Sequence, residues 1–171
     1  MNFVPDPLHP AVVHFPIVLV LFGAVVAMAA IFWRKRGLPV LAAGLLALGA
    51  LGTWAAIESG ESDGEQVERT LPGAGALVEE HESWAKWTLA VAILAAFAAG
   101  GSVLVARWPR TARTVAVAAA LISAAAVYAV YETGYRGGAL VYRHGVGLQV
   151  SGSPPAAPAA AHREARTPDT D

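Results

Sequence analysis

Histidines are the residues of this sequence that offer the most chemistry. The 171-residue chain has five of them, at His9, His14, His81, His144 and His162. Two of the five stand in the stretch "LHPAVVHFP", where an apolar run begins, and His14 lies inside that run. An ionisable side chain at such depth is costly and usually has a partner. We therefore expect His14 to be the buried histidine and His9 to lie at the boundary, whereas His162 falls in a polar tail and is set aside.

Neutral imidazole is the commonest metal ligand of biological side chains, and paired histidines on facing helices are a usual way for a bundle to hold b-type haem. The chain has no cysteine, which excludes disulfides, c-type haem attachment, thiolate zinc sites and protein-ligated iron–sulfur clusters. We expect His14 and His81 to be the axial ligands of a haem b iron, with His9 and His144 as alternates or a second site. The predicted function is a b-type cytochrome-like electron-transfer subunit with its haem near the outer face.

Other polar residues are expected to support this site. Glu58, at the end of an apolar run, and Glu132 can pair with a histidine or with Arg136, or relay a proton. Tyrosine hydroxyls near the same end can bond haem propionates or a quinone carbonyl, although tyrosines also serve as interfacial anchors. The supporting residues assigned to the site are Glu58, Tyr131, Tyr142 and Arg143.

Two other functions fit the same residues. In the first, the protein is a structural or anchoring subunit of a larger membrane complex without a cofactor, and His14 only locks the bundle. In the second, histidines and carboxylates bind copper or zinc on the outer side. No nucleophile–base pair, phosphate-binding loop or "HExxH" occurs in the sequence. We therefore expect an electron-transfer or accessory subunit and not a self-contained enzyme.

The elements that must position these residues are apolar helices. Hydrophobic residues make up 56% of the chain and charged residues 15%, against ~25% charged in an average soluble domain. Four apolar runs approach the ~20 residues needed to cross a bilayer. The sequence thus predicts an all-α integral membrane protein with a four-transmembrane-helix bundle in residues 1–150. We expect helices at about 11–33, 38–57, 84–106 and 114–135, an acidic loop at 58–83, a surface-lying segment at 136–150 and a disordered Pro/Ala-rich tail at 151–171.

The basic residues predict the orientation of these helices. Arg34, Lys35 and Arg36 fall between the first two runs, and three arginines fall between the last two, at 107, 110 and 113. The positive-inside rule then places both termini and the acidic loop outside the cell, in a multi-pass protein of the bacterial cytoplasmic membrane. We expect lipids and other subunits of a membrane redox complex as partners. The sequence has no basic stripe for nucleic acid.

The motifs "LHPAVVHFPIVL" at 8–19 and "GGALVYRHGVGL" at 137–148, together with His81, resemble the bacterial membrane-protein family labelled domain of unknown function 2231. The resemblance spans about residues 5–150 and implies four transmembrane helices, without an established activity. Some relatives are fused to Rieske or cytochrome c domains, which implies an association with electron-transfer proteins. Relatives often carry Gly-His where this chain has Gly134-Tyr135, and this departure favours one cofactor site over two.

Overall fold

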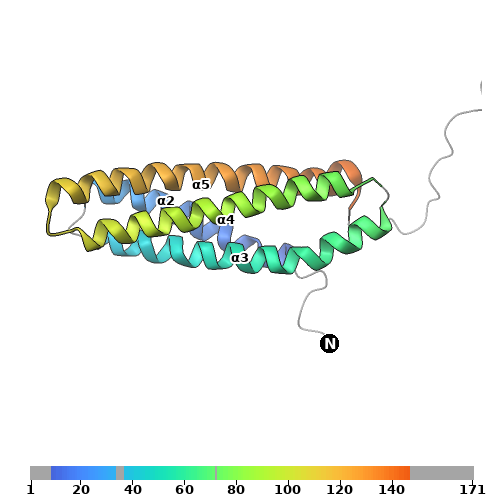
Figure 1. Cartoon of the computed structure of the whole chain (residues 1–171), viewed down its shortest axis with the longest axis horizontal. Helices are drawn as coiled ribbons and strands as arrows, with labels where there is room; N and C mark the ends of the chain where they lie inside the picture. The colour runs from blue at the N-terminus through green and yellow to red at the C-terminus, as the bar shows by residue number, and fades with distance from the viewer. Residues whose placement is uncertain (1–8, 34–36, 72, 147–171) are drawn as a thin grey trace, which may run out of the picture.

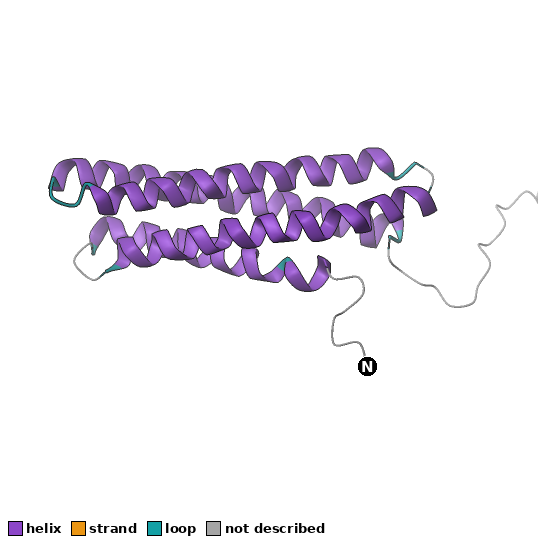
Figure 2. Ribbon diagram, turned by 60° about the horizontal axis from the view of Figure 1, so that its bottom comes forward, coloured by secondary structure: helices purple, strands orange, loops and turns teal. Residues whose placement is uncertain are grey.

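The protein is an elongated bundle of antiparallel helices, described here from a computed structural model that covers residues 9–33, 37–71 and 73–146 (Figure 1). Every regular element in this part of the chain is a helix (Figure 2). Four of them are long and apolar enough to cross a membrane, which confirms the predicted fold class. The helices are α1 (His9–Val12), α2 (His14–Phe32), α3 (Leu38–Thr70), α4 (Gly75–Leu104) and α5 (Pro109–His144).

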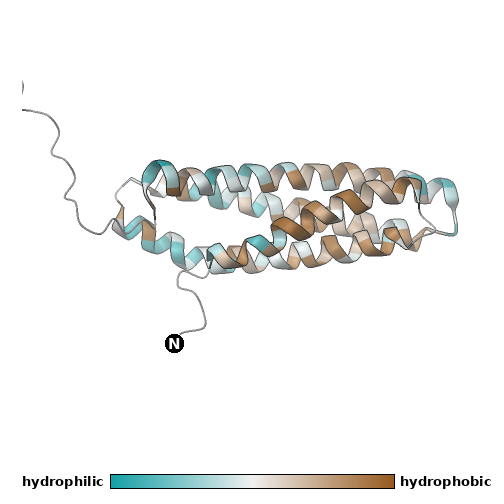
Figure 3. Ribbon diagram, turned by 180° about the vertical axis from the view of Figure 1, so that it is seen from behind, coloured by the Kyte–Doolittle hydropathy of each residue, from teal (hydrophilic) through white to brown (hydrophobic). Residues whose placement is uncertain are grey.

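The bundle carries its large hydrophobic side chains on the outside and its small ones inside. Phe22, Phe97 and Leu121 are all more than half exposed. The interior is built mainly from alanine, and one layer takes a residue from each long helix: Val20, Ala50, Ala92 and Ala126. Small residues let helix backbones approach closely where lipid removes the hydrophobic drive for association. In Figure 3 the ribbon of α2 has hydrophobic colours along most of its length, as expected of a helix that faces lipid.

Glycines set the close approach of α2 and α3. A Cβ added at Gly49 would lie 2.9 Å from Val20 Cγ2 and 3.3 Å from the Val20 backbone nitrogen. A Cβ at Gly23 would lie 2.9 Å from Leu46, and Gly52 faces the ring of Pro16 in the same way at 3.3 Å. Gly52 is therefore a position where α3 packs closely against α2. Gly44 is not, because nothing lies within 4 Å of its added Cβ.

Gly49→Ala is expected to lower the free energy of unfolding by ~1–3 kcal/mol, because the fully buried Val20 cannot move away from the added methyl group. Gly44→Ala is the matched control, and its open position should make it neutral or slightly stabilising. Thermal unfolding of both variants in detergent compares the two. Equal melting temperatures would show that α2 and α3 are not packed this closely.

The helices are longer than the sequence predicts, and this corrects two of the expected segments. The 58–83 connection is not a loop: α3 continues to Thr70, α4 begins at Gly75, and only a short turn joins them. The 136–150 segment is not surface-lying over its described part, because α5 continues to His144. At ~1.5 Å per residue the 33 residues of α3 extend ~50 Å, against ~30 Å of hydrocarbon. The predicted disordered tail, 151–171, lies outside the described residues.

A proline divides the first helix into α1 and α2. Proline lacks an N–H and its ring clashes with the carbonyl four residues earlier, which for Pro16 is that of Val12. The helix is interrupted at Val13, and the next backbone bond, from Ile17 to Val13, is stretched to 3.4 Å. The single turn of α1 packs on α3. The His9 side chain lies beside Ala56 and Gly60 of α3. Figure 1 shows that the N-terminal end of α2 points towards the same end of the bundle as the α3–α4 turn and the end of α5.

Candidate functional site

His9 is bonded to the neighbouring helix α3. Its Nδ1 lies 2.8 Å from the carbonyl oxygen of Ala56 and 3.2 Å from Ser59 Oγ. The Ser59 hydroxyl donates to the same Ala56 carbonyl at 2.9 Å. Because a carbonyl oxygen only accepts, Nδ1 carries a hydrogen, and the lone pair of the neutral tautomer would be on Nε2.

His81 on α4 has a similar arrangement, with a backbone carbonyl of α5 as its partner. Its Nδ1 lies 3.1 Å from the carbonyl oxygen of Thr133 on α5. The same reasoning leaves Nε2 of His81 as the nitrogen with the free lone pair. A backbone carbonyl that accepts the other ring hydrogen is the usual means of fixing the tautomer and orientation of a metal-binding histidine.

The two imidazoles lie next to each other in the bundle. Their ring centroids are 6.3 Å apart and their planes are nearly perpendicular, at 88°. The two rings therefore form an edge-to-face pair. Glycines make room for each ring: an added Cβ would lie 2.9 Å from His9 at Gly60, and 3.0 Å from His81 at Gly137. The structure therefore assembles a histidine pair from α1 and α4, with glycine clearance supplied by α3 and α5.

His14 is not the buried histidine, contrary to the expectation from its depth in the apolar run. It is exposed, and its Nδ1 bonds at 2.8 Å to the carbonyl of Pro10 in its own turn. Six residues separate His14 from the buried Val20, which is about one and two-thirds turns, so the two side chains point about a third of a turn apart around the helix. His9 takes its place beside His81.

The other expected site residues lie on the surface. His144 is exposed in the last turn of α5, and Glu58 is exposed on α3. Tyr142 is 87% exposed, so it does not line the histidine pair. Tyr131 stacks on Tyr135 at 6.4 Å, and Arg143 Nη2 donates to the Tyr135 hydroxyl at 3.3 Å. These aromatic and basic side chains form a strip on the outside of α5 and are not brought to His9 and His81.

An ion-pair network joins α4 and α5 next to the histidine pair. Arg136 donates from Nε to Glu80 at 2.9 Å, and from Nη1 to the Glu132 carboxylate. Its guanidinium lies 4.6 Å from the centroid of the Trp84 ring. The pairing of Arg136 with Glu132 matches one alternative that the sequence suggests. Glu80 and Trp84 belong to the network without a motif to mark them.

Thr88 and Thr133 form a second link between α4 and α5. Their hydroxyl oxygens are 2.8 Å apart, and each oxygen also lies close to a carbonyl one turn earlier in its own helix. Thr133 thus holds Thr88 through its side chain and His81 through its carbonyl. The sequence does not single out either threonine, because a threonine in an apolar run has the same pattern whether or not it has a partner on another helix.

Thr133→Val is expected to destabilise the bundle by ~0.6–1.7 kcal/mol, the range for a hydrogen bond between helices in a membrane protein. Thr114→Val is the matched control, because the exposed Thr114 hydroxyl bonds only one turn back, to Arg110. Unfolding in mixed detergent micelles compares the two variants. A larger loss for Thr114→Val would contradict a bond across the two helices.

Within the described residues, the pair is not joined by a third side chain of the metal-binding kinds, since no group of three or more His, Cys, Asp or Glu is close enough to hold an ion. What the arrangement offers is two imidazoles, each oriented by a backbone carbonyl of a neighbouring helix. No curated protein matches this chain. No solved structure matches it either. A family model described as "Predicted membrane protein (DUF2231)" matches residues 5–150, which is most of the chain and includes both histidines and the glycines that face them. The chain therefore belongs to the DUF2231 family of predicted membrane proteins.

Proposed function

We propose that this protein is a membrane electron-transfer subunit that holds a haem b iron between His9 and His81. The observation that carries the proposal is the matched setting of the two rings, each fixed through Nδ1 by a backbone carbonyl of another helix. The pair differs from the one that the sequence favours, since His9 stands in place of His14. Burial and contacts support the exchange, because His14 is exposed whereas His9 is partly buried and lies beside His81.

The number of ligands favours haem over a copper or zinc ion. A structural zinc site takes four protein ligands and a catalytic one three. A bound haem needs only two axial ligands from the protein, because the macrocycle supplies the other four. The described residues provide two imidazoles together and no larger cluster. Gly60 and Gly137 let each imidazole lie directly against the backbone of a neighbouring helix.

Each residue at the proposed site would have a separate role. His9 and His81 would hold the iron, and the carbonyls of Ala56 and Thr133 would keep both rings in one tautomer. The chemistry that bound haem supplies is the uptake and release of one electron. The Arg136 network beside the pair keeps α4 and α5 at a fixed spacing, so that Thr133 stays opposite His81.

We also propose that the histidine end of the bundle faces the outside of a bacterial cytoplasmic membrane. The described ends of α1 and α5 and the α3–α4 turn share this end (Figure 1). The opposite end carries the connections rich in arginine and lysine, and such connections are retained on the cytoplasmic side. An electron partner would then be an extracytoplasmic protein or another subunit of a membrane redox complex.

The absorption spectrum of the full chain, purified from a haem-replete host, tests the proposal. We expect a Soret band, an α-band on reduction, and about one haem per chain, as two axial histidines imply. Metal analysis after dialysis forms the second arm of the test. A colourless protein, or one that holds copper or zinc without haem, would contradict haem binding; with no metal at all, the histidines would be hydrogen-bond donors that lock the helices.

A further inference from the structure

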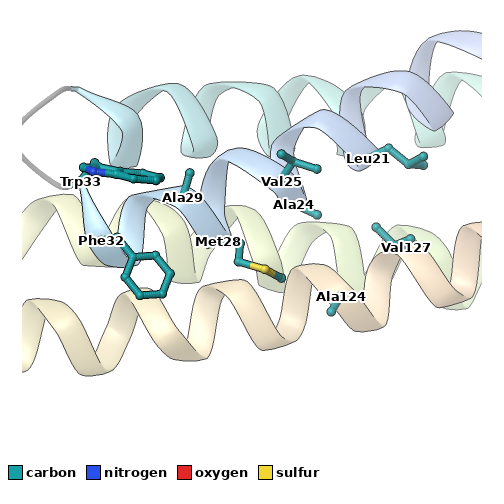
Figure 4. Close-up of a pocket in the computed structure, with 9 residues that line it drawn as sticks. All are labelled: Leu21, Ala24, Val25, Met28, Ala29, Phe32, Trp33, Ala124 and Val127. Atoms are coloured by element: carbon teal, nitrogen blue, oxygen red, sulfur yellow. The ribbon is translucent and has the colours of Figure 1, made fainter.

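We propose that a groove between α2 and α5 binds one acyl chain of an anionic phospholipid whose headgroup is held by Arg110 and Arg113. The groove has a volume of about 540 Å³ and is lined only by hydrophobic side chains (Figure 4). On α2 these include Leu21, Met28, Phe32 and Trp33, and on α5 they are Ala124 and Val127. It lies far from the histidine pair, and the proposal is independent of haem.

The length of the groove indicates a lipid chain and not a partner helix. Its lining runs along α2 from Leu21 to Trp33, which is ~18 Å at ~1.5 Å per residue. A transmembrane helix docked on this face would need contact over ~30 Å of hydrocarbon. The groove instead covers the half of α2 that ends at Trp33, which matches one leaflet of the bilayer. A lipid of that leaflet would place its headgroup beyond Trp33.

Basic residues stand at this end of the groove. The end of α2 and the beginning of α5 lie at the same end of the bundle (Figure 1). Arg113 precedes Ala124 by 11 residues and Val127 by 14, roughly three and four turns, so it continues the stripe of α5 that lines the groove. Arg110 is one turn earlier, and both arginines are exposed. Basic pockets between transmembrane helices recognise anionic lipid headgroups.

The groove itself exists because α5 presents small residues where α2 presents large ones. Ala124 is exposed and leaves the space that Met28 and Phe32 border without filling it. Figure 4 shows Ala124 on the opposite side of this space from the larger side chains of α2. Ala116 and Ala120, two turns and one turn earlier in α5, are by contrast at most 5% exposed. A small side chain at 124 therefore opens a space towards lipid.

The test is native mass spectrometry of the full chain after release from nanodiscs that contain equal amounts of phosphatidylglycerol and phosphatidylcholine with the same acyl chains. We expect phosphatidylglycerol to be retained at least about five-fold more often, a preference of the size that one or two headgroup contacts provide. Arg110→Gln combined with Arg113→Gln should remove the preference. Lys86→Gln, at the opposite end of the bundle, is the charge control and should preserve it.

A second variant tests the groove separately from the headgroup contacts. Ala124→Phe fills the groove and should reduce retention of phosphatidylglycerol by at least about five-fold. Ala125→Phe adds the same side chain at the next exposed position, which does not line the groove, and should leave retention unchanged. Equal retention of the two lipids by the original chain would overturn the proposal. So would an Ala124→Phe variant that keeps its lipid but loses self-association, since the groove would then bind a second copy of the chain.

Discussion

His81→Ala is expected to remove haem from the protein, and His9→Ala is expected to do the same. Each variant deletes one of the two imidazoles that we propose to hold the iron. Haem content should then fall by more than about ten-fold, since even the loss of a hydrogen-bond partner of a ligand lowers metal affinity 10–100-fold. Haem per chain, measured from the reduced spectrum of purified protein, gives the result. His14→Ala is the matched control: His14 is exposed and bonds only within its own turn, so haem content should not change.

A folding control is needed because both histidines also bond across helices. Circular dichroism and gel filtration of each variant establish that the bundle is intact. Imidazole added to His81→Ala should restore a low-spin spectrum, because the deleted ring leaves a space beside Gly137. The assignment would be wrong if His14→Ala lost its haem while His9→Ala kept it, and the pair expected from sequence depth would then be the ligands.

The contrast between His9 and His14 shows what the sequence could and could not predict. Depth in an apolar run locates a residue along the membrane normal but does not say which side of the helix it occupies. The helical period does. The buried residues Pro16, Val20 and Ala27 lie on one stripe of α2, and extending the stripe backwards from Val20 by 11 residues, about three turns, reaches His9. His14 lies about a third of a turn away from Val20. The helical spacing of these residues therefore indicates that His9 faces the bundle, which the length of the apolar run alone does not.

The extent of α3 and α4 was predictable in a similar way. A high density of acidic residues at 58–83 favours a solvated loop, but charged residues are equally suited to a helix that continues beyond the membrane. Glu65 pairs with Arg69, and Glu82 with Lys86, both at the i,i+4 spacing that stabilises helices. The contacts across helices were not predictable, since nothing in the sequence indicates that Thr133 lies opposite His81 or that Arg136 meets Glu80. Those neighbours depend on the register of α4 against α5.

The four apolar helices themselves could be predicted from hydropathy, because each contains a long run of hydrophobic residues with few charges. The end of α5 could not be predicted in this way, because the helix contains several glycines before it ends. Glycine lowers helix propensity by ~1 kcal/mol relative to alanine, so "GYRGG" predicts an end to the helix. The helix continues because Gly137 receives the His81 ring, and packing outweighs propensity. It ends only where Gly145 adopts a φ of 72°, and the N–H groups of Gly145 and Val146 bond back to the last turns.

Gly137→Leu is therefore expected to disrupt the site without altering either histidine. A Cβ at this position would lie 3.0 Å from His81 Cε1 and 3.3 Å from Nδ1, and the rest of the leucine would displace the ring from the Thr133 carbonyl. We expect a 10–100-fold loss of haem affinity, as for removal of an outer-shell partner, and an overpacking cost of ~1–3 kcal/mol in stability. Haem titration and thermal unfolding measure the two effects.

Gly134→Leu provides the comparison that isolates the contact with His81. It lies in the same helix, is exposed, and has nothing within 4 Å of its added Cβ, so both haem affinity and melting temperature should stay close to those of the original chain. The thermal measurement also separates packing from cofactor binding, because the overpacking at Gly137 does not depend on haem. Unchanged stability in Gly137→Leu would mean that the imidazole of His81 does not rest on α5. Reduced stability with unchanged haem affinity would instead show that His81 packs against α5 but is not a ligand of the iron.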